Sequence, residues 1–378
     1  MAVYTSIDNP ELYFQCKLYT GNGSTNAITL DGDENMQPDL VWVKRRNGAT
    51  KSMLFDNARS ANFLQTESSD AEQDGADYFV SLDSDGFTFE GSDNSNNASS
   101  QTYVAWCWKM ANGTASNSNG TNITSTVSAN TTAGQSIVSY SGSGTTSDTV
   151  GHGLSSLDFL IVKSRGENDS WFVKHKDLAS SKNLNLNQTV AETDVTSAYS
   201  EGGLSNLSGN TFGFLDGTSD ANAVNESSEA HIAYCFKSVQ GYSKFGSFTG
   251  NGNASGTFVF CGFRPAWILI KNSSSVTSWT LYDNKRPGFN EDNAYLLPDA
   301  SDNELSDKDI DLLSNGFKPR TSNSALNTSG DTYIFMAFAE APFVNSKGVP
   351  ANSRWLNKIT KLIRGEVHYE GATNYDYV

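Results

Sequence analysis

Residues 103–108 read YVAWCW, and close copies of this segment return as HIAYCF at residues 231–236 and YIFMAF at residues 333–338. Each copy holds six residues, most of them apolar and many of them aromatic or β-branched. A run of this length and composition is typical of a β-strand that is buried on both faces, and it is too short for an average helix. The sequence therefore predicts the same buried strand at three places in the chain.

Four further landmarks precede each copy in the same order. They are a glycine-rich turn, an apolar strand that ends in lysine, a short second strand, and a turn that leads into phenylalanine. The turns lie at residues 19–23, 140–144 and 248–252, the lysine-ended strands at 38–44, 157–163 and 265–271, the second strands at 53–56, 171–174 and 279–282, and the phenylalanines at Phe87, Phe212 and Phe317. A fixed order of landmarks that occurs three times indicates an internal repeat.

Glycine-containing turns separate the predicted strands at intervals of about ten to fifteen residues, which is typical of antiparallel sandwiches. We predict an all-β protein with three tandem homologous antiparallel β-sandwich domains, jelly-roll or lectin-like, plus a short C-terminal amphipathic helix. The expected divisions are an N-terminal arm at 1–15, repeat 1 at 16–110, a linker rich in Asn, Ser, Thr and Gly at 111–133, repeat 2 at 134–238, repeat 3 at 239–343 and a C-terminal tail at 344–378.

The joint between repeats 2 and 3 is shorter than the linker and contains Tyr242 and Phe245. We therefore expect repeats 2 and 3 to hold a more fixed orientation than repeats 1 and 2.

The composition excludes several classes of protein. The 26 basic and 42 acidic side chains give a formal net charge of −16, which argues against a nucleic-acid-binding surface. The apolar runs are far shorter than the ~20 residues that a transmembrane helix needs, so we expect no membrane insertion. The first residues lack the features of a secretory signal, so we expect synthesis in a reducing cytoplasm.

The four cysteines have the spacing of neither a disulfide framework nor a zinc site. Cys107 and Cys235 occupy one repeat position, where the third copy has Ala337. A position that accepts either Cys or Ala favours a small buried group. We therefore expect these thiols to serve packing rather than redox chemistry.

The histidines form no catalytic or metal-binding pattern. His231 stands where the other repeats carry Tyr103 and Tyr333, which predicts an aromatic-sized spacer at the start of a strand. No histidine belongs to a nucleophile motif, and no pair has a metal-ligand spacing. We expect no catalytic residues, no cofactor and no metal. The four histidines are His152, His175, His231 and His368.

A glutamate recurs beyond the second strand of each repeat, as Glu72, Glu192 and Glu304. A carboxylate repeated three times is a weak candidate ligand for a metal cation or a sugar. Alternatively, each carboxylate accepts backbone N–H bonds in a tight turn. We favour the turn.

Two other charged features recur at strand ends. An aspartate followed three residues later by an arginine predicts a turn with a local ion pair. The lysine that closes the long apolar strand predicts a solvated hairpin tip. The aspartate–arginine pairs are Asp56–Arg59 and Asp283–Arg286, and the lysines are Lys44, Lys163 and Lys271.

Aromatic residues make up 11% of the chain, and loops rich in Asn, Asp and Gly surround them. Sugar-binding proteins use such combinations, whereas small sandwiches use aromatic rings to fill their cores. Most of the rings lie on the apolar strands, so we favour core packing and keep a host-surface glycan as an alternative ligand.

The tail contains the one convincing helical pattern, over residues 354–364. Apolar side chains recur on one helix face, and basic residues line the opposite side. An apolar face outside the sandwiches needs a partner, either its own domains or another subunit, so we predict a helix at an assembly interface. A calmodulin-target or membrane-surface helix has a similar pattern. The apolar residues are Trp355, Leu356, Ile359, Leu362 and Ile363, and the basic ones are Arg354, Lys358, Lys361 and Arg364.

Several long phrases resemble a known family. The chain is similar to uncharacterised β-sandwich repeat domains in structural and tail-fibre-like proteins of marine bacteriophages, the cyanophages and pelagiphages, and the similarity covers residues ~7 to 350. The phrases include IDNPELYFQCKLYTGNGS at 7–24, PDLVWVKRRNG at 38–48, SANTTAGQSIVSYSGSG at 128–144, HIAYCFKSVQGYSKFGSFTGNG at 231–252 and TYIFMAFAEAPFV at 332–344. The resemblance implies a virion component and brings no catalytic residues.

We therefore expect a binding or structural protein of the virion, made in the host cytoplasm, rather than an enzyme. The preferred assignment is a tail-fibre or fibre-like appendage protein that mediates assembly and host-surface attachment. A capsid decoration protein or tail-accessory protein is the first alternative, and a polysaccharide depolymerase is the second. Expected partners are other virion proteins, further copies of the chain in a homo-oligomer, with a trimer favoured, and a host glycan.

Overall fold

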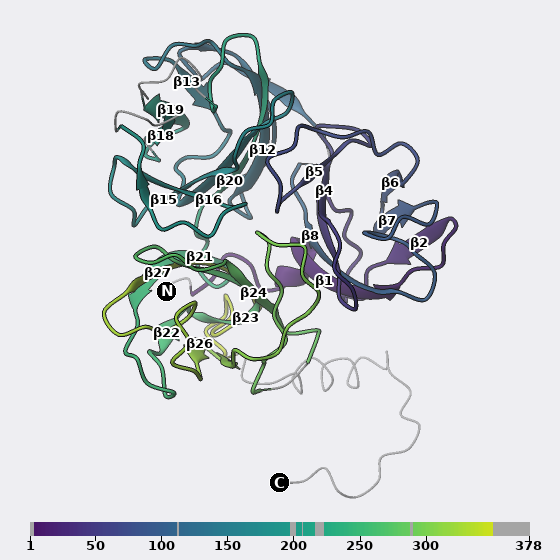
Figure 1. The fold of residues 1–378 in the computed structure, drawn as a ribbon, viewed down its shortest axis with the longest axis vertical. Helices are drawn as coiled ribbons and strands as arrows, with labels where there is room; N and C mark the ends of the chain where they lie inside the picture. Colours follow the sequence, from purple (N-terminus) through teal and green to yellow (C-terminus); the bar gives the residue numbers. More distant parts are fainter. Residues whose placement is uncertain are drawn as a thin grey trace, which may run out of the picture.

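The computed structural model describes residues 4–111, 113–196, 202–205, 207–215, 223–287 and 290–350. Within these ranges the strands form six sheets, and the one helical turn is the 3₁₀ helix η1 (Pro10–Leu12), so the predicted all-β class is confirmed. The strands gather in residues 14–108, 115–236 and 243–342, which we call segments 1, 2 and 3. Figure 1 shows the three segments around a common centre, with segment 1 at the right, segment 2 at the top and segment 3 at the bottom.

Segment 1 consists of a five-stranded and a three-stranded sheet. Its strands are β1 (Phe14–Thr20), β2 (Asn26–Thr29), β3 (Leu40–Arg45), β4 (Ser52–Asp56), β5 (Phe63–Gln65), β6 (Phe79–Asp83), β7 (Gly86–Phe89) and β8 (Thr102–Trp108). The order is β1-β8-β3-β4-β5 in the larger sheet and β2-β7-β6 in the smaller one. All of these pairings are antiparallel.

Segment 2 consists of an eight-stranded and a four-stranded sheet. Its strands are β9 (Ala115–Asn117), β10 (Asn122–Ile123), β11 (Ser125–Asn130), β12 (Gln135–Ser141), β13 (Thr149–Gly151), β14 (Phe159–Ser164), β15 (Phe172–His175), β16 (Lys182–Asn185), β17 (Thr193–Asp194), β18 (Gly203–Ser205), β19 (Thr211–Leu215) and β20 (Ala230–Phe236). The order is β17-β16-β15-β14-β20-β12-β11-β9 in the larger sheet and β10-β13-β19-β18 in the smaller one. The short β10–β13 pair is parallel, in contrast to the antiparallel pairs around it.

Segment 3 consists of a four-stranded and a three-stranded sheet. Its strands are β21 (Ser243–Thr249), β22 (Val259–Phe260), β23 (Phe263–Asn272), β24 (Thr280–Asp283), β25 (Ile310–Leu313), β26 (Gly316–Pro319) and β27 (Thr332–Pro342). The order is β21-β27-β23-β24 in the larger sheet and β22-β26-β25 in the smaller one, with antiparallel pairing.

The three larger sheets share one strand order. The series β1-β8-β3-β4 in segment 1 corresponds to β12-β20-β14-β15 in segment 2 and to β21-β27-β23-β24 in segment 3. The register also agrees at the centre of β8, β20 and β27, which we call the closing strands of the three segments. Trp106 pairs with Trp42, Tyr234 with Ile161, and Met336 with Leu269.

Each larger sheet separates two cores, because successive side chains of a strand point to opposite faces. On β3, Val41 and Val43 pack against the smaller sheet of segment 1, whereas Leu40 and Trp42 point away from it. The strands β14 and β23 show the same alternation, with Leu160 and Ile268 on the outer side. Each segment is therefore sandwich-like, with its own outer core.

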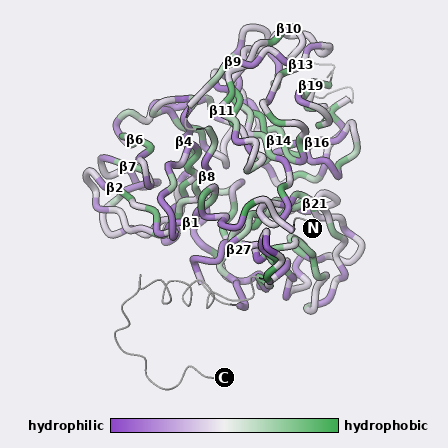
Figure 2. The backbone as a smooth tube through the Cα atoms, turned by 180° about the vertical axis from the view of Figure 1, so that it is seen from behind, coloured by the Kyte–Doolittle hydropathy of each residue, from purple (hydrophilic) through white to green (hydrophobic). Residues whose placement is uncertain are grey.

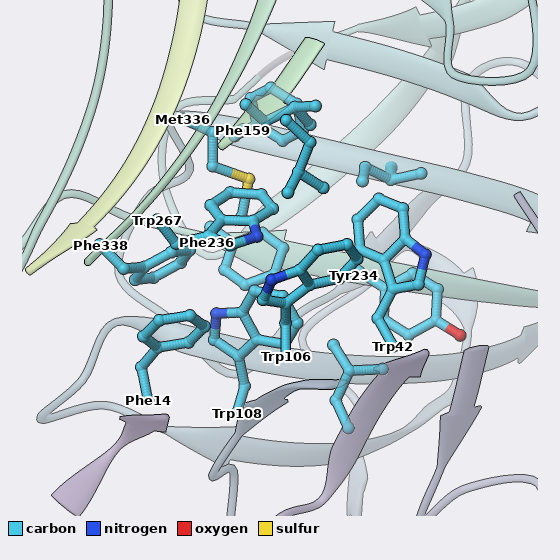
Figure 3. Close-up of a cluster of buried hydrophobic side chains, with 14 of the residues drawn as sticks. Phe14, Trp42, Trp106, Trp108, Phe159, Tyr234, Phe236, Trp267, Met336 and Phe338 are labelled. Carbon is cyan, nitrogen blue, oxygen red and sulfur yellow. The ribbon is translucent and has the colours of Figure 1, made fainter. Parts of the chain in front are cut away.

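The inner faces of the three larger sheets meet in one central core (Figure 3). The rings of Trp108 and Trp267 lie edge to face with their centroids 5.5 Å apart, and both contact Phe338. Tyr234 and Met336 reach the same core from segments 2 and 3. Figure 2 shows the hydrophobic stretches on the inner strands and hydrophilic loops at the periphery. This shared core fixes the three segments relative to one another.

Two further connections lie in the central core. Tyr242, in the joint between segments 2 and 3, and Phe245, on the β21 strand that follows it, are both completely buried there. Ahead of β1, Ile7 is buried in the same core, and the Thr5 hydroxyl donates to the Gln240 carbonyl at 2.8 Å. The N-terminal residues thus tie segment 1 to the joint between the other two.

A buried asparagine holds each repeated glycine turn. In segment 1 the Asn97 side-chain nitrogen donates to the Ser24 carbonyl (2.6 Å), and its oxygen accepts from the Asn22 N–H (3.2 Å). A Cβ at Gly21 would lie 2.3 Å from the Ala98 carbonyl oxygen, so only glycine fits there. The turn motif therefore serves the fold. The equivalent asparagines are Asn225 and Asn327.

The structure differs from the sequence-based divisions at one place and does not describe another. Residues 115–130, expected within a linker, form β9 to β11, and β11 extends the larger sheet by pairing with β12. The predicted helix at 354–364 lies outside the described residues, as do its apolar residues. The described part of the chain contains no helix long and apolar enough to cross a membrane. The apolar residues in question are Trp355, Leu356, Ile359, Leu362 and Ile363.

Candidate functional site

The three recurring glutamates lie at the three places where one segment meets the next. In each case the glutamate's backbone N–H donates a hydrogen bond to a carbonyl of the following segment. The pairs are Glu72 with Arg165 (2.7 Å), Glu192 with Ser273 (2.9 Å) and Glu304 with Arg46 (2.9 Å). Segment 1 thus binds segment 2, segment 2 binds segment 3, and segment 3 binds segment 1. We call these contacts junctions 1–2, 2–3 and 3–1, and together they form a closed ring.

The glutamates are not brought together, because each lies at a different junction. A metal site needs several ligands at one point, so the three carboxylates do not form a common site. Among the described residues, no group of three or more His, Cys, Asp or Glu side chains could hold a metal ion. The favoured interpretation, in which each carboxylate accepts backbone N–H bonds in a tight turn, does not describe Glu72 and Glu304. Their carboxylates bind arginine side chains of another segment.

Junction 1–2 contains a buried ionic network. Arg165 of segment 2 binds the Glu72 carboxylate through two nitrogens at 2.8 and 2.9 Å, and Arg59 lies 3.6 Å from it. Arg59 also binds Asp56 at 2.7 Å, with both side chains fully buried. The Tyr234 hydroxyl of segment 2 donates to Asp56 at 2.6 Å. Burial tends to raise the pKa of Glu72, but hydrogen bonds from Arg165 and Asn62 and the charge of Arg59 hold that pKa below its usual value.

Junction 3–1 repeats the arrangement with other residues. Arg46 of segment 1 binds the Glu304 carboxylate at 2.8 and 3.1 Å, and Arg286 lies 3.5 Å from it. Arg286 binds Asp283 at 2.7 Å, and both side chains are fully buried. The Trp106 indole N–H of segment 1 donates to Asp283 at 3.0 Å, in the place that the Tyr234 hydroxyl takes at junction 1–2. The predicted local aspartate–arginine pairs are thus confirmed, and they are parts of contacts between segments.

Junction 2–3 has different side chains at the same positions. His175 replaces the aspartate, Leu178 replaces the first arginine, and Ser273 replaces the second. Leu178 is buried in the central core, and the His175 Nδ1 atom accepts a hydrogen bond from the Asp177 N–H at 3.0 Å. Burial lowers the pKa of His175 to about 4, so the ring is neutral at pH 7. These positions are therefore filled without a buried ion pair.

The lysines that close the long strands are buried, so the prediction of a solvated hairpin tip is wrong. Lys44, Lys163 and Lys271 each expose at most 1% of their surface. The Lys44 ammonium donates to the Ala300 carbonyl of segment 3 at 2.8 Å, and that of Lys271 to the Thr189 carbonyl of segment 2 at 3.2 Å. Burial lowers the pKa of each lysine to about 8. Two of the three lysines therefore add charged hydrogen bonds across junctions.

The described histidines and the cysteines serve packing. The His231 ring stacks on Tyr140 with centroids 5.0 Å apart, as Tyr103 stacks on Tyr19 at 5.1 Å. Burial lowers the pKa of His152 and His231 to about 4. All four thiols are free and buried, and burial raises their pKa values. The interpretation of His231 as an aromatic spacer is confirmed, and His368 lies outside the described residues.

Sequence reasoning missed four exposed apolar side chains, two of them in segment 3 and two near the ends of the described chain. Tyr4, Phe258, Phe260 and Val349 have exposed fractions of 47, 45, 54 and 43%. We call these four residues the segment-3 patch. The alternation of the sequence could have revealed the two phenylalanines of this patch. Phe258 and Phe260 flank the one inward residue of a short edge strand, which leaves both rings on the solvent side.

The comparisons with known proteins identify a family. The chain belongs to a family of domains of unknown function, DUF7483, and the match spans residues 9–342. The match covers all three segments of the chain. Neither a curated protein nor a solved structure matches the chain.

Proposed function

We propose that the protein is a structural protein of a bacteriophage virion, preferably a tail-fibre or fibre-like appendage protein that mediates assembly and host-surface attachment. The observation that carries the proposal is the closed ring of junctions 1–2, 2–3 and 3–1 around one central core. Such an arrangement makes a single rigid body with its polar loops outward, which suits a particle component that presents surfaces to partners. The resemblance of the repeated phrases to marine phage proteins supplies the setting.

We also propose that the three segments are homologous β-sandwich domains, jelly-roll or lectin-like in class. Support comes from the strand order that the three larger sheets share and from the equivalent places of Trp106, Tyr234 and Met336. The buried asparagines under the three glycine turns add a matching side-chain detail.

A binding or structural role is preferred to catalysis because the glutamates and described histidines that the sequence singled out are engaged in junctions or buried. The Glu72 and Glu304 carboxylates bind arginines at the junctions, and His152, His175 and His231 are buried and neutral. Catalytic carboxylates of a depolymerase would need a groove that admits a sugar chain.

The tail is proposed as the assembly element that contacts other virion proteins and further copies of the chain in a homo-oligomer, a trimer in a fibre. The last described strand, β27, ends at Pro342, so the segments close without residues 351–378. Removing residues 351–378 should leave a folded protein that no longer assembles. A truncated chain that joins its partners normally would contradict this role.

Localisation on the particle tests the main proposal. Antibody-labelled particles viewed by electron microscopy should carry the label on tail fibres or fibre-like appendages. A regular lattice of label over the capsid shell would favour the decoration-protein alternative. Incubation of the pure protein with host capsule or lipopolysaccharide tests the other alternative, because chain shortening that the heat-unfolded protein does not cause would indicate a depolymerase.

A further inference from the structure

Segment 3 differs from the other segments in its short outer strand. The registers place Val259 opposite Phe317, as Ile28 lies opposite Phe87 and Val150 opposite Phe212. Phe258 and Phe260 therefore correspond to Ala27 and Thr29 in segment 1 and to Thr149 and Gly151 in segment 2. The exposed rings are thus not required by the fold, because two segments form the same sheet without them.

The segment-3 patch lies where the described chain ends. The Phe343 N–H donates to the Gly262 carbonyl at 3.2 Å, and Gly262 packs against the Phe260 ring. Val344 and Pro350 form an isolated bridge, which holds the end of the described chain close to that point. Val349 itself belongs to the patch, and the Tyr4 ring covers Gly348.

We propose that the segment-3 patch is the docking surface for residues 354–364 of the same chain. The sequence gives these residues five large apolar side chains at helical spacing, which need cover, and the patch offers exposed rings that also need cover. Trp355 lies five residues beyond Pro350, a stretch that can span at most about 17 Å, so the patch is within easy reach.

Docking on the same chain has a consequence for assembly. The apolar residues would face the patch, so Arg354, Lys358, Lys361 and Arg364 would face outward. A chain with a net charge of −16 provides acidic surfaces on its neighbours, which such a basic row would attract. This consequence rests on the proposed assembly role, whereas the docking itself does not.

Limited proteolysis of the full chain tests the docking. Trypsin cleaves after the four basic residues of the tail, and cleavage follows the fraction of time that the tail is undocked. The double variant Phe258→Ser, Phe260→Ser should be cleaved in the tail at least about tenfold faster than the wild type. The matched control is Val80→Ser with Val276→Ser, which alters exposed apolar residues outside the patch and should leave the rate within about twofold. Equal rates in all three proteins would overturn the proposal.

A cross-link distinguishes the same chain from a second copy. The native cysteines are buried, so a disulfide between Phe260→Cys and Ile359→Cys can form without competition from them. We expect the oxidised product to migrate as a single chain. A disulfide-linked dimer would overturn docking on the same chain and assign the patch to a second copy. Both readouts use the free protein, so their failure leaves the virion proposal standing.

Discussion

Junctions 1–2 and 2–3 use equivalent positions in different ways. Both keep the backbone hydrogen bond from the glutamate loop to the next segment, at 2.7 and 2.9 Å. Their side chains differ. The positions that hold Asp56, Arg59 and Arg165 at junction 1–2 hold His175, Leu178 and Ser273 at junction 2–3. The backbone contact and the central core are therefore the common way to close the ring, and the buried ion pairs are an addition.

The chain connections suggest why two junctions carry ions. Segments 2 and 3 are joined by the short stretch between Phe236 and Ser243, which already dictates which surfaces meet. The equivalent connection, from β8 of segment 1 to β12 of segment 2, is longer, because it runs from Trp108 to Gln135 and includes β9 to β11. No direct connection joins segment 3 to segment 1. Buried ion pairs add little net stability but penalise wrong pairings. We infer that they specify the two junctions that the connectivity leaves open.

The largest effect should come from breaking one ionic junction. Arg59→Leu installs the residue found at Leu178, and it leaves the buried Asp56 carboxylate without its arginine. Removal of one member of a buried pair costs about 3–5 kcal/mol of unfolding free energy. Urea unfolding measures this loss of unfolding free energy. The double variant Asp56→His, Arg59→Leu copies junction 2–3 and should recover more than half of the loss. A single variant as stable as the wild type would contradict the comparison.

The next largest effect concerns the central residue of each closing strand. Tyr234→Phe removes a hydroxyl that donates to Asp56 at 2.6 Å and accepts from Arg59 at 3.1 Å. A hydrogen bond to a charged group contributes about 1.5–3 kcal/mol. Met336 holds the same place at junction 2–3 with no hydrogen bond to lose, so Met336→Leu should cost less than about 1.5 kcal/mol. Equal losses in the two variants would show that the ionic network does not depend on Tyr234.

Acid should weaken junction 2–3, which contains the neutral His175 ring in place of an ion pair. Burial lowers the pKa of His175 from an ordinary 6.5 to about 4, and the nearby charges of Asp177, Lys176 and Asp158 have smaller effects. Between these two values the unfolded chain binds a proton that the folded chain does not. This contribution to stability is complete above about pH 6.5 and falls by about 1.4 kcal/mol per pH unit down to pH 4. His175→Gln should reduce the slope of the stability profile over that range by about 1.4 kcal/mol per pH unit, and His152 and His231, whose pKa values are lowered in the same way, should keep the rest of the slope. An unchanged slope would mean that His175 is charged in the folded protein.

A comparison of equivalent positions also applies to the outer cores. Asn96 is fully buried, and no described protein group is hydrogen-bonded to its side-chain amide. The equivalent residues Val224 and Leu326 are buried and apolar. Asn96→Leu should therefore stabilise the protein by about 1 kcal/mol, because it removes an unpaired polar group. Asn97→Leu is the control and should destabilise it by more, since the Asn97 amide holds the glycine turn. A destabilised Asn96→Leu protein would show that the amide has a partner.

The sequence predicted the strands better than the contacts between segments. The closing strands and the Cys107/Cys235/Ala337 position were identifiable because burial on both faces leaves a local apolar pattern. The lysines were misjudged because a lysine at a strand end usually reaches solvent. Here a neighbouring segment supplies the carbonyls that Lys44 and Lys271 bind, and no local pattern shows which segment will be near.

The recurring glutamates show the same limit. Their spacing marked one structural position three times, and the structure bears this out. The partner of Glu72 is Arg165, 93 residues away, and the partner of Glu304 is Arg46, 258 residues away. The ring order that joins them depends on the shared core, and a repeat pattern alone does not contain that order.

The smallest expected effect comes from adding a charged side chain to junction 2–3. Ser273→Arg places an arginine opposite Glu192, at the position from which Arg165 binds Glu72. Arg165 keeps 24% of its side chain exposed, so an added arginine would be partly solvated, and such pairs contribute about 0.2–1 kcal/mol. We expect a gain within that range that shrinks at high salt, since exposed charges are screened. Ser273→Gln is the neutral control for side-chain length. If Ser273→Arg stabilised the protein by several kcal/mol, the backbone bond and the core would not suffice to close junction 2–3, and the connectivity argument would fail.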